Sequence, residues 1–465
     1  MNKKERSNFT GKLGFVMAAA GSAVGLGNIW RFPYLAAKDN GGVFILVYII
    51  LALTFGFTLL TTDIAIGRKT QQGPLTAYGL IHKKWKWLGG LAWIVPVIIP
   101  PYYCTIGGWV LKYMTAYFTG QTEAATGDGY FTGFITAQTA PIVFALIFLT
   151  ATGVVVFCGV EKGIEKFSKV LMPILVLLII GISIYSLTIK HTGDDGTIRT
   201  GFDGLKVYLI PDFKGMTFRD IFMVVMDAMG QLFFSISVAM GIMVAYGSYV
   251  KNDVNLIFDT AVAFLAGLMI VPAVYVFSGT EGMSAGPGLM FISLPKVFNA
   301  MGKVGTVIGA LFFIMVTFAA ITSSVSVMEA IVSGLMDKFH LTRKKSAVIT
   351  TVYAVVGMLV VCFGYNIWYF ELKLPNGATA QILDVMDYLS NNIFMPLVAI
   401  LSCILIGWVV KPKTVIDEVT RNGEKFVRKG LYIVMVKFVA PVLLALLLLQ
   451  SFGIDFVQFV TNLFK

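Results

Sequence analysis

The sequence predicts an all-α integral membrane protein, and three observations support this prediction. Of its 465 residues, 57% are hydrophobic and only 13% are charged, whereas a soluble domain is about 25% charged. The apolar residues form runs of roughly 20 or more, each about long enough to cross a hydrocarbon core some 30 Å thick. These runs are continuous rather than alternating, which excludes a β-barrel, and a backbone surrounded by lipid must then be helical.

The hydropathy pattern predicts eleven spans within one domain that covers residues 1–465. They run approximately over 13–38, 42–67, 88–118, 140–158, 166–190, 219–249, 254–280, 303–336, 346–370, 381–410 and 430–455. Residues 1–12 form a polar, basic tail without the apolar core of a signal peptide. Residues 281–302 are expected to form a short helical hairpin.

The loop charges predict the orientation of these spans. Lys and Arg gather in the tail and in the connections after spans two, eight and ten, while residues 119–139 contain neither. Cytoplasmic loops carry the excess of Lys and Arg. We therefore expect a plasma-membrane (inner-membrane) protein with a cytoplasmic N-terminus and an outside C-terminus. The net charge of +11 is then a topology signal, and nucleic acid is not expected as a partner.

The residues that usually carry catalysis or bind transition metals are scattered. The four cysteines and three histidines stand singly, with no CxxC or Cys/His spacing. The hydroxyls of span eight have no nearby histidine or lysine in the sequence. We therefore expect neither an enzyme nor an organic cofactor.

The first span contains signals that predict a broken helix. It reads AAAGSAVGLGNIWRFP, with Gly21, Gly25 and Gly27 inside seven residues, followed by Asn28 and Arg31. Glycines at this density weaken a membrane helix and free backbone groups. The spacing of Gly21 and Gly25 also suits close helix packing. Packing alone does not account for the polar Asn28 and the cationic Arg31.

The sixth span contains a matching interruption. It reads QLFFSISVAMGIM, and Gln231, Ser235, Ser237 and Gly241 interrupt its apolar pattern. The separation of five helices predicts inverted repeats, with spans 1–5 in residues 13–190, spans 6–10 in 219–410 and an eleventh span at 430–455. Paired breaks indicate a midplane site where half-helix N-termini face an anionic group and freed carbonyls face a cation.

Further polar groups lie in the apolar spans. Span eight holds consecutive hydroxyls from Thr322 to Ser324, which are oxygen ligands of the kind that sodium or magnesium prefers. Asp259 lies near the start of span seven. Span ten opens with LDVMDY, and Arg31 is the expected partner of its Asp387.

These motifs together resemble the neurotransmitter:sodium symporter family, in particular its bacterial amino-acid transporters with eleven spans. The most specific one is AVGLGNIWRFPYLA, from Ala23 to Ala36. The pair Tyr102–Tyr103, QLFFSIS, ITSS and LDVMDY follow in the family's order, and the resemblance extends through span ten. It implies sodium-coupled import of a neutral hydrophobic or aromatic L-amino acid by alternating access.

The resemblance also implies a set of functional residues. The substrate site would comprise Ala23, Gly25, Leu26, Gly27, Ile99, Tyr103, Phe234, Ser235, Ser237, Met240, Ser323 and Val327. One sodium would be held by Ala23, Asn28, Ser235 and Asp259, and a second by Gly21, Val24, Ala319, Thr322 and Ser323. Arg31 and Asp387 would form an outer gate, and Arg6, Tyr249 and Asp337 an inner latch, with Phe9 at the family's tryptophan position.

The chain departs from the family at two informative positions. Ala239 stands where many relatives have glycine, which weakens the expectation of a break in span six. Asp259 stands where sodium is usually met by Asn, and its negative charge would repel an anion held by Tyr48, Gln231 and Ser235. We therefore expect that chloride is not required.

The residues leave two questions open. Leucine-like and aromatic substrates both fit the implied pocket. A membrane sensor of the same fold, which binds substrate without transporting it, would retain the same site. A channel is less consistent with broken helices around a zwitterion-sized site.

Overall fold

The computed structural model describes residues 9–10, 12–127, 129–192, 197–249, 275–276, 288–421, 423, 425–454 and 456. Within this part of the chain, eight helices are long and apolar enough to cross a membrane. They are Gly42–Thr70 (α3 Gly42–Leu51, η2 Ala52–Gly56, α4 Phe57–Thr70), Lys83–Phe118 (η3 Lys83–Trp85, α6 Lys86–Phe118), Ala140–Cys158 (α8), Val160–Thr188 (η5 Val160–Glu165, α9 Lys166–Thr188), Gly302–Phe339 (α15), Arg343–Phe363 (α16), Ile382–Val409 (α17 Ile382–Asp387, η7 Tyr388–Phe394, α18 Met395–Ile404, η8 Leu405–Val409) and Lys429–Ser451 (α20 Lys429–Val434, η9 Met435–Val439, α21 Ala440–Ser451). The predicted seventh span, 254–280, lies almost wholly outside the described residues.

The first span is broken, as predicted. Helix α1 (Lys12–Ala23) ends before Gly25, and the chain resumes as η1 (Gly27–Arg31) and α2 (Phe32–Lys38). The two halves meet at an angle of 65°. The break falls in the glycine-rich segment, where few side chains are available to stabilise helix packing.

The sixth span is also broken, between α11 (Phe218–Ile236) and α12 (Ile242–Gly247). Three residues in the break have left-handed backbone conformations: Ser237 at φ 50°, Ala239 at φ 57° and Gly241 at φ 73°. A left-handed L-residue costs roughly 1–2 kcal/mol. The break therefore forms even though Ala239 replaces the family's glycine, and surrounding contacts must stabilise it.

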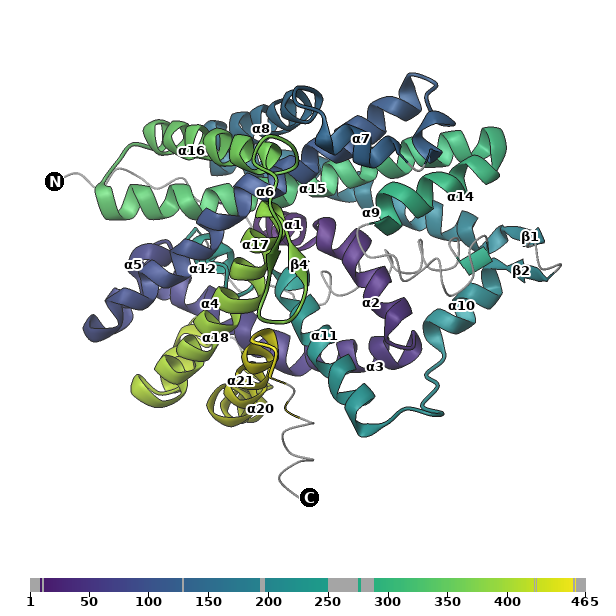
Figure 1. Ribbon diagram of the computed structural model, residues 1–465. Coiled ribbons are helices and arrows are strands. Elements are labelled where there is room, and N and C mark those ends of the chain that lie inside the picture. Colours follow the sequence, from purple (N-terminus) through teal and green to yellow (C-terminus); the bar gives the residue numbers. More distant parts are fainter. Residues whose placement is uncertain are drawn as a thin grey trace.

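Two long helices form the centre of the protein. Helix α6 (Lys86–Phe118) packs against α15, α8 and α5 (Pro74–Ile81). Its most apolar window is 83% buried, compared with 33% for α8 and 28% for the last span. Helix α1 packs against α15, and Figure 1 shows both near the middle, with α8 and α16 along one edge and α18 and α21 along the opposite one. The peripheral helices direct apolar side chains outward, as expected in lipid.

Short elements fill the connections. Antiparallel pairs join β1 (Lys190–Thr192) to β2 (Ile198–Thr200) and β3 (Leu372–Lys373) to β4 (Thr379–Ala380). The remaining elements are η4 (Ala124–Thr126), α7 (Tyr130–Thr136), α10 (Gly201–Leu209), η6 (Leu289–Ser293), α14 (Leu294–Ala300) and α19 (Lys413–Val419). The hairpin expected over 281–302 is described only from Gly288 onward, as η6 and α14.

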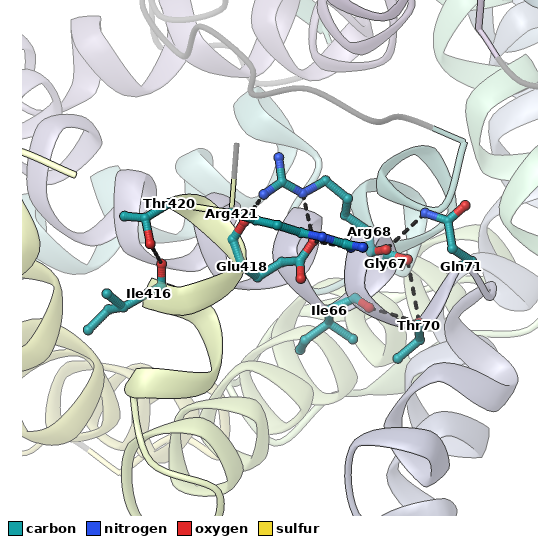
Figure 2. A network of polar contacts seen from close by, with 9 residues as sticks. All are labelled: Ile66, Gly67, Arg68, Thr70, Gln71, Ile416, Glu418, Thr420 and Arg421. Carbon is teal, nitrogen blue, oxygen red and sulfur yellow. Dashed lines mark hydrogen bonds and ion pairs between the residues drawn. The ribbon is translucent and has the colours of Figure 1, made fainter. Parts of the chain in front are cut away.

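A buried ion pair fixes the connection between spans ten and eleven. At the end of α4, Arg68 donates from Nε to the Glu418 carboxylate in α19 at 2.9 Å, and its Nη2 donates to the Glu418 backbone carbonyl (Figure 2). Both side chains are about 95% buried. Arg421 approaches the same carboxylate at 3.7 Å and is largely exposed. Helix α19 is thereby held against the end of the second span.

Candidate functional site

A cavity of about 590 Å³ extends from the break in the first span to the β3–β4 loop. Leu26, Gly27, Tyr103 and Phe234, all predicted substrate residues, line it. The other lining residues are Arg31, Tyr34, Tyr102, Ile106, Trp109, Phe131, Ile135, Tyr365, Glu371, Thr379, Gln381, Leu383, Asp384 and Asp387. The cavity thus combines backbone, aliphatic and aromatic groups at the break with the charged side chains of Arg31, Glu371, Asp384 and Asp387.

The glycines at the break permit close approach of three other spans. The Leu26 N–H donates to the Tyr103 hydroxyl at 3.3 Å. A Cβ added at Gly25 would lie 2.7 Å from Ser323 Oγ, and one added at Gly27 would lie 3.1 Å from Phe234 Cβ. A side chain at either position would displace these neighbours, so the packing of this site requires glycine.

Four of the twelve predicted substrate residues line the cavity: Leu26, Gly27, Tyr103 and Phe234. The other eight do not: Ala23, Gly25, Ile99, Ser235, Ser237, Met240, Ser323 and Val327. Ile99, Met240 and Val327, expected around the substrate side chain, are each about 95% buried. The predicted side-chain pocket is therefore not open to the cavity in this structure.

A polar network joins the breaks of spans one and six. The Asn28 amide donates to the Ala23 carbonyl at 2.6 Å and accepts from Ser235 Oγ at 2.7 Å. Gln231 Nε2 donates to the Gly27 carbonyl at 3.0 Å. The network thus brings together three residues predicted for the first sodium site, while Asp259 lies outside the described residues.

The residues predicted for the second sodium site lie between spans one and eight. Ser323 Oγ donates to the carbonyls of Gly21 at 3.2 Å and Ser22 at 3.0 Å. Thr322 Oγ1 donates to the Ala319 carbonyl at 3.0 Å. Val24 is fully buried in the same segment of span one. The arrangement gathers carbonyl and hydroxyl oxygens, the ligand type that hard cations prefer.

Sequence reasoning missed two residues at the breaks. Ser22 Oγ donates to Ser237 Oγ at 3.0 Å, which links the two breaks directly. Asp63, in α4, is 4% exposed and accepts from the Ala239 N–H at 2.9 Å. A carboxylate within an apolar span is a signal that would have identified Asp63, whereas nothing in the sequence distinguishes Ser22.

Both residues of the predicted outer gate line the cavity. The Arg31 guanidinium lies over the Phe234 ring, with Cζ 5.0 Å from the ring centre. The Asp387 carboxylate accepts a hydrogen bond from Asn391 Nδ2. No ion pair joins Arg31 to Asp387, although the structure describes both side chains.

The predicted inner latch is described in part, because Arg6 lies outside the described residues. The Tyr249 hydroxyl donates to Glu329 at 2.8 Å, and Arg343 donates to the same carboxylate at 2.9 Å. Asp337 accepts from the Gly73 N–H at 2.6 Å. Glu329, which is fully buried, and Arg343 were not predicted, since nothing in the sequence indicates that spans eight and nine supply partners to Tyr249.

The N-terminal segment contacts the helices at this end. Phe9 packs edge-to-face on Tyr246, with ring centres 5.7 Å apart. Thr10 donates its backbone N–H to Glu165 Oε2 at 2.9 Å, and its hydroxyl donates to the other carboxylate oxygen. Glu165 is 2% exposed and also accepts from Lys169. One carboxylate on span five therefore holds the entry to span one.

A helical membrane fold with two broken spans that meet at a shared polar site is the architecture of many secondary transporters. The family model described as "Sodium:neurotransmitter symporter family" matches residues 6–129 and 129–462, and the chain belongs to this family. The predicted family is thus confirmed, and the protein is a sodium-dependent transporter rather than an enzyme.

Similar proteins cover nearly the whole chain. An uncharacterized sodium-dependent transporter of Haemophilus influenzae is 30% identical over 474 residues, covering 97% of this chain and 99% of the relative. The Bacillus subtilis transporter YhdH, also uncharacterized, is 30% identical over 469 residues, covering 98% and 99%. The human sodium- and chloride-dependent GABA transporter 2 is 26% identical over 477 residues, covering 89% and 75%.

The fold is similar to that of a solved transporter. The crystal structure of MhsT in complex with L-phenylalanine is 33% identical in sequence, with a TM-score of 0.82. The match covers 96% of this chain and all of that chain. It confirms the predicted all-helical, multi-span architecture.

Proposed function

We propose that the protein is a sodium-coupled symporter that imports a neutral hydrophobic or aromatic L-amino acid by alternating access. The cavity that ends at the break in span one is the observation that carries this proposal. The predicted substrate residues that line it, Leu26, Gly27, Tyr103 and Phe234, carry no charge, and the nearby Arg31 guanidinium lies over the Phe234 ring. An amino acid bound there would have its charged main-chain groups met by backbone dipoles and its side chain met by apolar surface.

The broken helix offers partners for both substrate charges. Backbone N–H groups near Leu26 and Gly27, with the Tyr103 hydroxyl, would meet the carboxylate. Carbonyls around Ala23, Phe234 and Ser235, with the Ser237 hydroxyl, would meet the ammonium group. The Leu26 N–H bonds Tyr103 in this structure and would be available to the carboxylate once that 3.3 Å bond opens.

The substrate side chain would enter between Ile99, Met240, Ser323 and Val327. None of these carries a charge, which favours a neutral substrate. Met240 is flexible and Val327 small, so rearrangement around an aromatic ring is feasible. MhsT is similar over the whole fold and was crystallised with L-phenylalanine, which supports the aromatic class.

Two sodium ions would supply the driving force. Ala23, Asn28, Ser235 and Asp259 would hold one, and Gly21, Val24, Ala319, Thr322 and Ser323 the other. A membrane potential of roughly 100 mV contributes about 2.3 kcal/mol per inward charge, or on the order of 4.6 kcal/mol for two ions moving with a zwitterion. We propose that chloride is not required, because Asp259 already supplies negative charge at the first site.

Alternating access would use groups at both ends of the broken helices. Closure of the outer side would bring the Arg31 guanidinium from Phe234 to Asp387. Opening of the inner side would release Arg6, Tyr249 and Asp337 from their partners. With the N-terminus in the cytoplasm, as the loop charges indicate, the cavity would face outward.

Uptake into proteoliposomes tests this proposal. Labelled tyrosine, tryptophan and leucine are supplied with an inward sodium gradient, or with potassium in place of sodium. Saturable accumulation only with sodium is expected, and the ranking of the three identifies the substrate. Binding without accumulation would instead indicate a sensor of the same fold, and accumulation that ignores sodium would contradict the proposal.

A further inference from the structure

Two adjoining grooves of about 480 and 400 Å³ lie where α5, η3 (Lys83–Trp85), the start of α6 and the end of α15 meet. Leu75, Lys86 and Lys338 line both grooves, so the two form one continuous surface. Lys83 lines one and Lys84 and Trp87 line the other. We call this surface the lysine groove.

The lysine groove is strongly cationic. Its four lysines, Lys83, Lys84, Lys86 and Lys338, are all exposed. No carboxylate of the described residues lies within ion-pair distance of any of them. Four uncompensated positive charges around one hollow favour an anion with several oxygens, because each ammonium group can donate to a different oxygen.

The surroundings of the groove are apolar and lie at the ends of membrane helices. Trp87 is 55% exposed and stacks on Trp85 with ring centres 5.8 Å apart, and Leu80 is 64% exposed. Lys86 begins α6 and Lys338 is the second-last residue of α15, two helices that cross the membrane. Exposed tryptophan at such positions is typical of the headgroup region of a bilayer.

We propose that the lysine groove binds the phosphate headgroup of an anionic phospholipid. The lysines would surround the phosphate, while Trp87 and Leu80 would contact the upper acyl chains. Basic pockets between membrane helices on the cytoplasmic side commonly bind such headgroups. In the proposed orientation the groove faces the cytoplasmic leaflet, where anionic lipids and the predicted cationic loops meet.

The groove adjoins a hydrogen bond of the inner latch. Asp337, which precedes Lys338, accepts from the N–H of Gly73, which follows Gln72 of the groove. A headgroup in the groove therefore contacts both segments that this 2.6 Å bond joins. Bound lipid would hold α5 against α15 and thereby favour the closed inner side.

Lipid binding to the purified full-length protein tests the proposal without any transport step. Phosphatidylglycerol and phosphatidylcholine are titrated separately and bound lipid is counted by native mass spectrometry. The wild type is expected to prefer phosphatidylglycerol. K338Q should weaken that binding roughly fivefold, as expected for one lysine, and the K83Q/K84Q/K86Q/K338Q protein by at least tenfold.

A matched variant controls for loss of charge. K411Q/K413Q/K425Q/K429Q removes four exposed lysines between the end of span ten and the first residue of span eleven, on the side that the loop charges also predict to be cytoplasmic, and should leave the preference unchanged. Equal binding of the two lipids to the wild type, or equal loss in both quadruple variants, would overturn the proposal. If the protein binds inorganic phosphate but not phosphatidylglycerol, the proposal is also overturned, and the groove is a site for soluble phosphate. If the groove quadruple variant fails to fold, the fivefold effect of K338Q decides alone.

Discussion

The Asp63 carboxylate, in the second span, accepts a hydrogen bond of 2.9 Å from the Ala239 N–H in the break of the sixth. Ala239 occupies a left-handed conformation at φ 57°, and Asp63 is 4% exposed. A buried backbone N–H that the helix no longer pairs needs another acceptor, and the Asp63 carboxyl oxygen supplies it. This contact explains how the break persists with alanine in place of glycine.

Substitutions at Ala239 test whether the break requires the left-handed conformation of this residue. Ala239→Val adds a β-branched side chain to a left-handed residue, so we expect thermal unfolding to indicate a loss of about 1–3 kcal/mol and sodium-dependent uptake to fall. Ala239→Gly keeps the N–H donor to Asp63 and should retain uptake. A fully stable, active valine variant would show that the left-handed conformation is not needed.

The buried pair of Arg68 and Glu418 provides a second prediction (Figure 2). Glu418→Gln leaves the Arg68 guanidinium buried without a counter-charge, and we expect a loss of about 3–5 kcal/mol in unfolding free energy. Arg421→Ala, which removes the exposed member, should cost no more than about 0.5 kcal/mol. The double variant Arg68→Met/Glu418→Leu should recover much of the loss in unfolding free energy. If the losses of the Arg68→Met and Glu418→Leu single variants simply add in the double variant, the ion-pair interpretation is contradicted.

A third prediction concerns pH and the loop after span one. Burial, and then the nearby carboxylate of Asp227, raise the pKa of Asp39 to about 7, although the ammonium group of Lys38 opposes this. Between the ordinary value near 3.8 and pH 7 the folded protein retains a proton that the unfolded chain has lost. Stability should therefore fall as pH rises through this window, by up to about 1.4 kcal/mol per pH unit.

Thermal unfolding measured from roughly pH 5 to roughly pH 8, a range that includes the raised pKa of Asp39, checks this expectation. Asp39→Asn cannot titrate and should flatten the profile. Glu123→Gln, which alters an exposed carboxylate in another loop, should leave it unchanged. A wild-type profile that rises with pH would show that the sign is wrong.

Glu165 provides a fourth prediction, because it bonds both the N–H and the hydroxyl of Thr10. Glu165→Gln removes the charge and should accelerate backbone hydrogen exchange in residues 9–20 on the order of tenfold, equivalent to about 1.4 kcal/mol. Glu161→Gln, an exposed carboxylate in the same span, is the matched control. Equal exchange in both variants would mean that Glu165 does not hold the entry to span one.

The sequence predicted the features that depend on local composition. Glycines around Gly25 and polar residues around Ser237 weaken their own helices, so both breaks follow from residues close together in the chain. The resemblance then indicated sets such as Asn28 with Ser235, which the structure brings within 2.7 Å.

Contacts between distant spans were not predictable in this way. The pairs Asp63–Ala239 and Glu329–Arg343 depend on which helices pack together, and periodicity carries no such information. The burial of Val327 away from the cavity depends on the conformation adopted, which composition does not determine. Arg6 and Asp259 lie outside the described residues, and the roles assigned to all the site residues stay predictions.

The sodium dependence of uptake in a matched pair of span-eight variants tests the central claim most directly. Ser323 Oγ bonds the carbonyls of Gly21 and Ser22, whereas the neighbouring Ser324 hydroxyl faces Cys104. Ser323→Ala removes one oxygen ligand and should therefore raise the half-saturating sodium concentration at least about tenfold. Ser324→Ala should leave that concentration within about twofold of the wild-type value. Sodium curves identical to the wild type in both variants, or uptake independent of sodium, would contradict sodium coupling at this site.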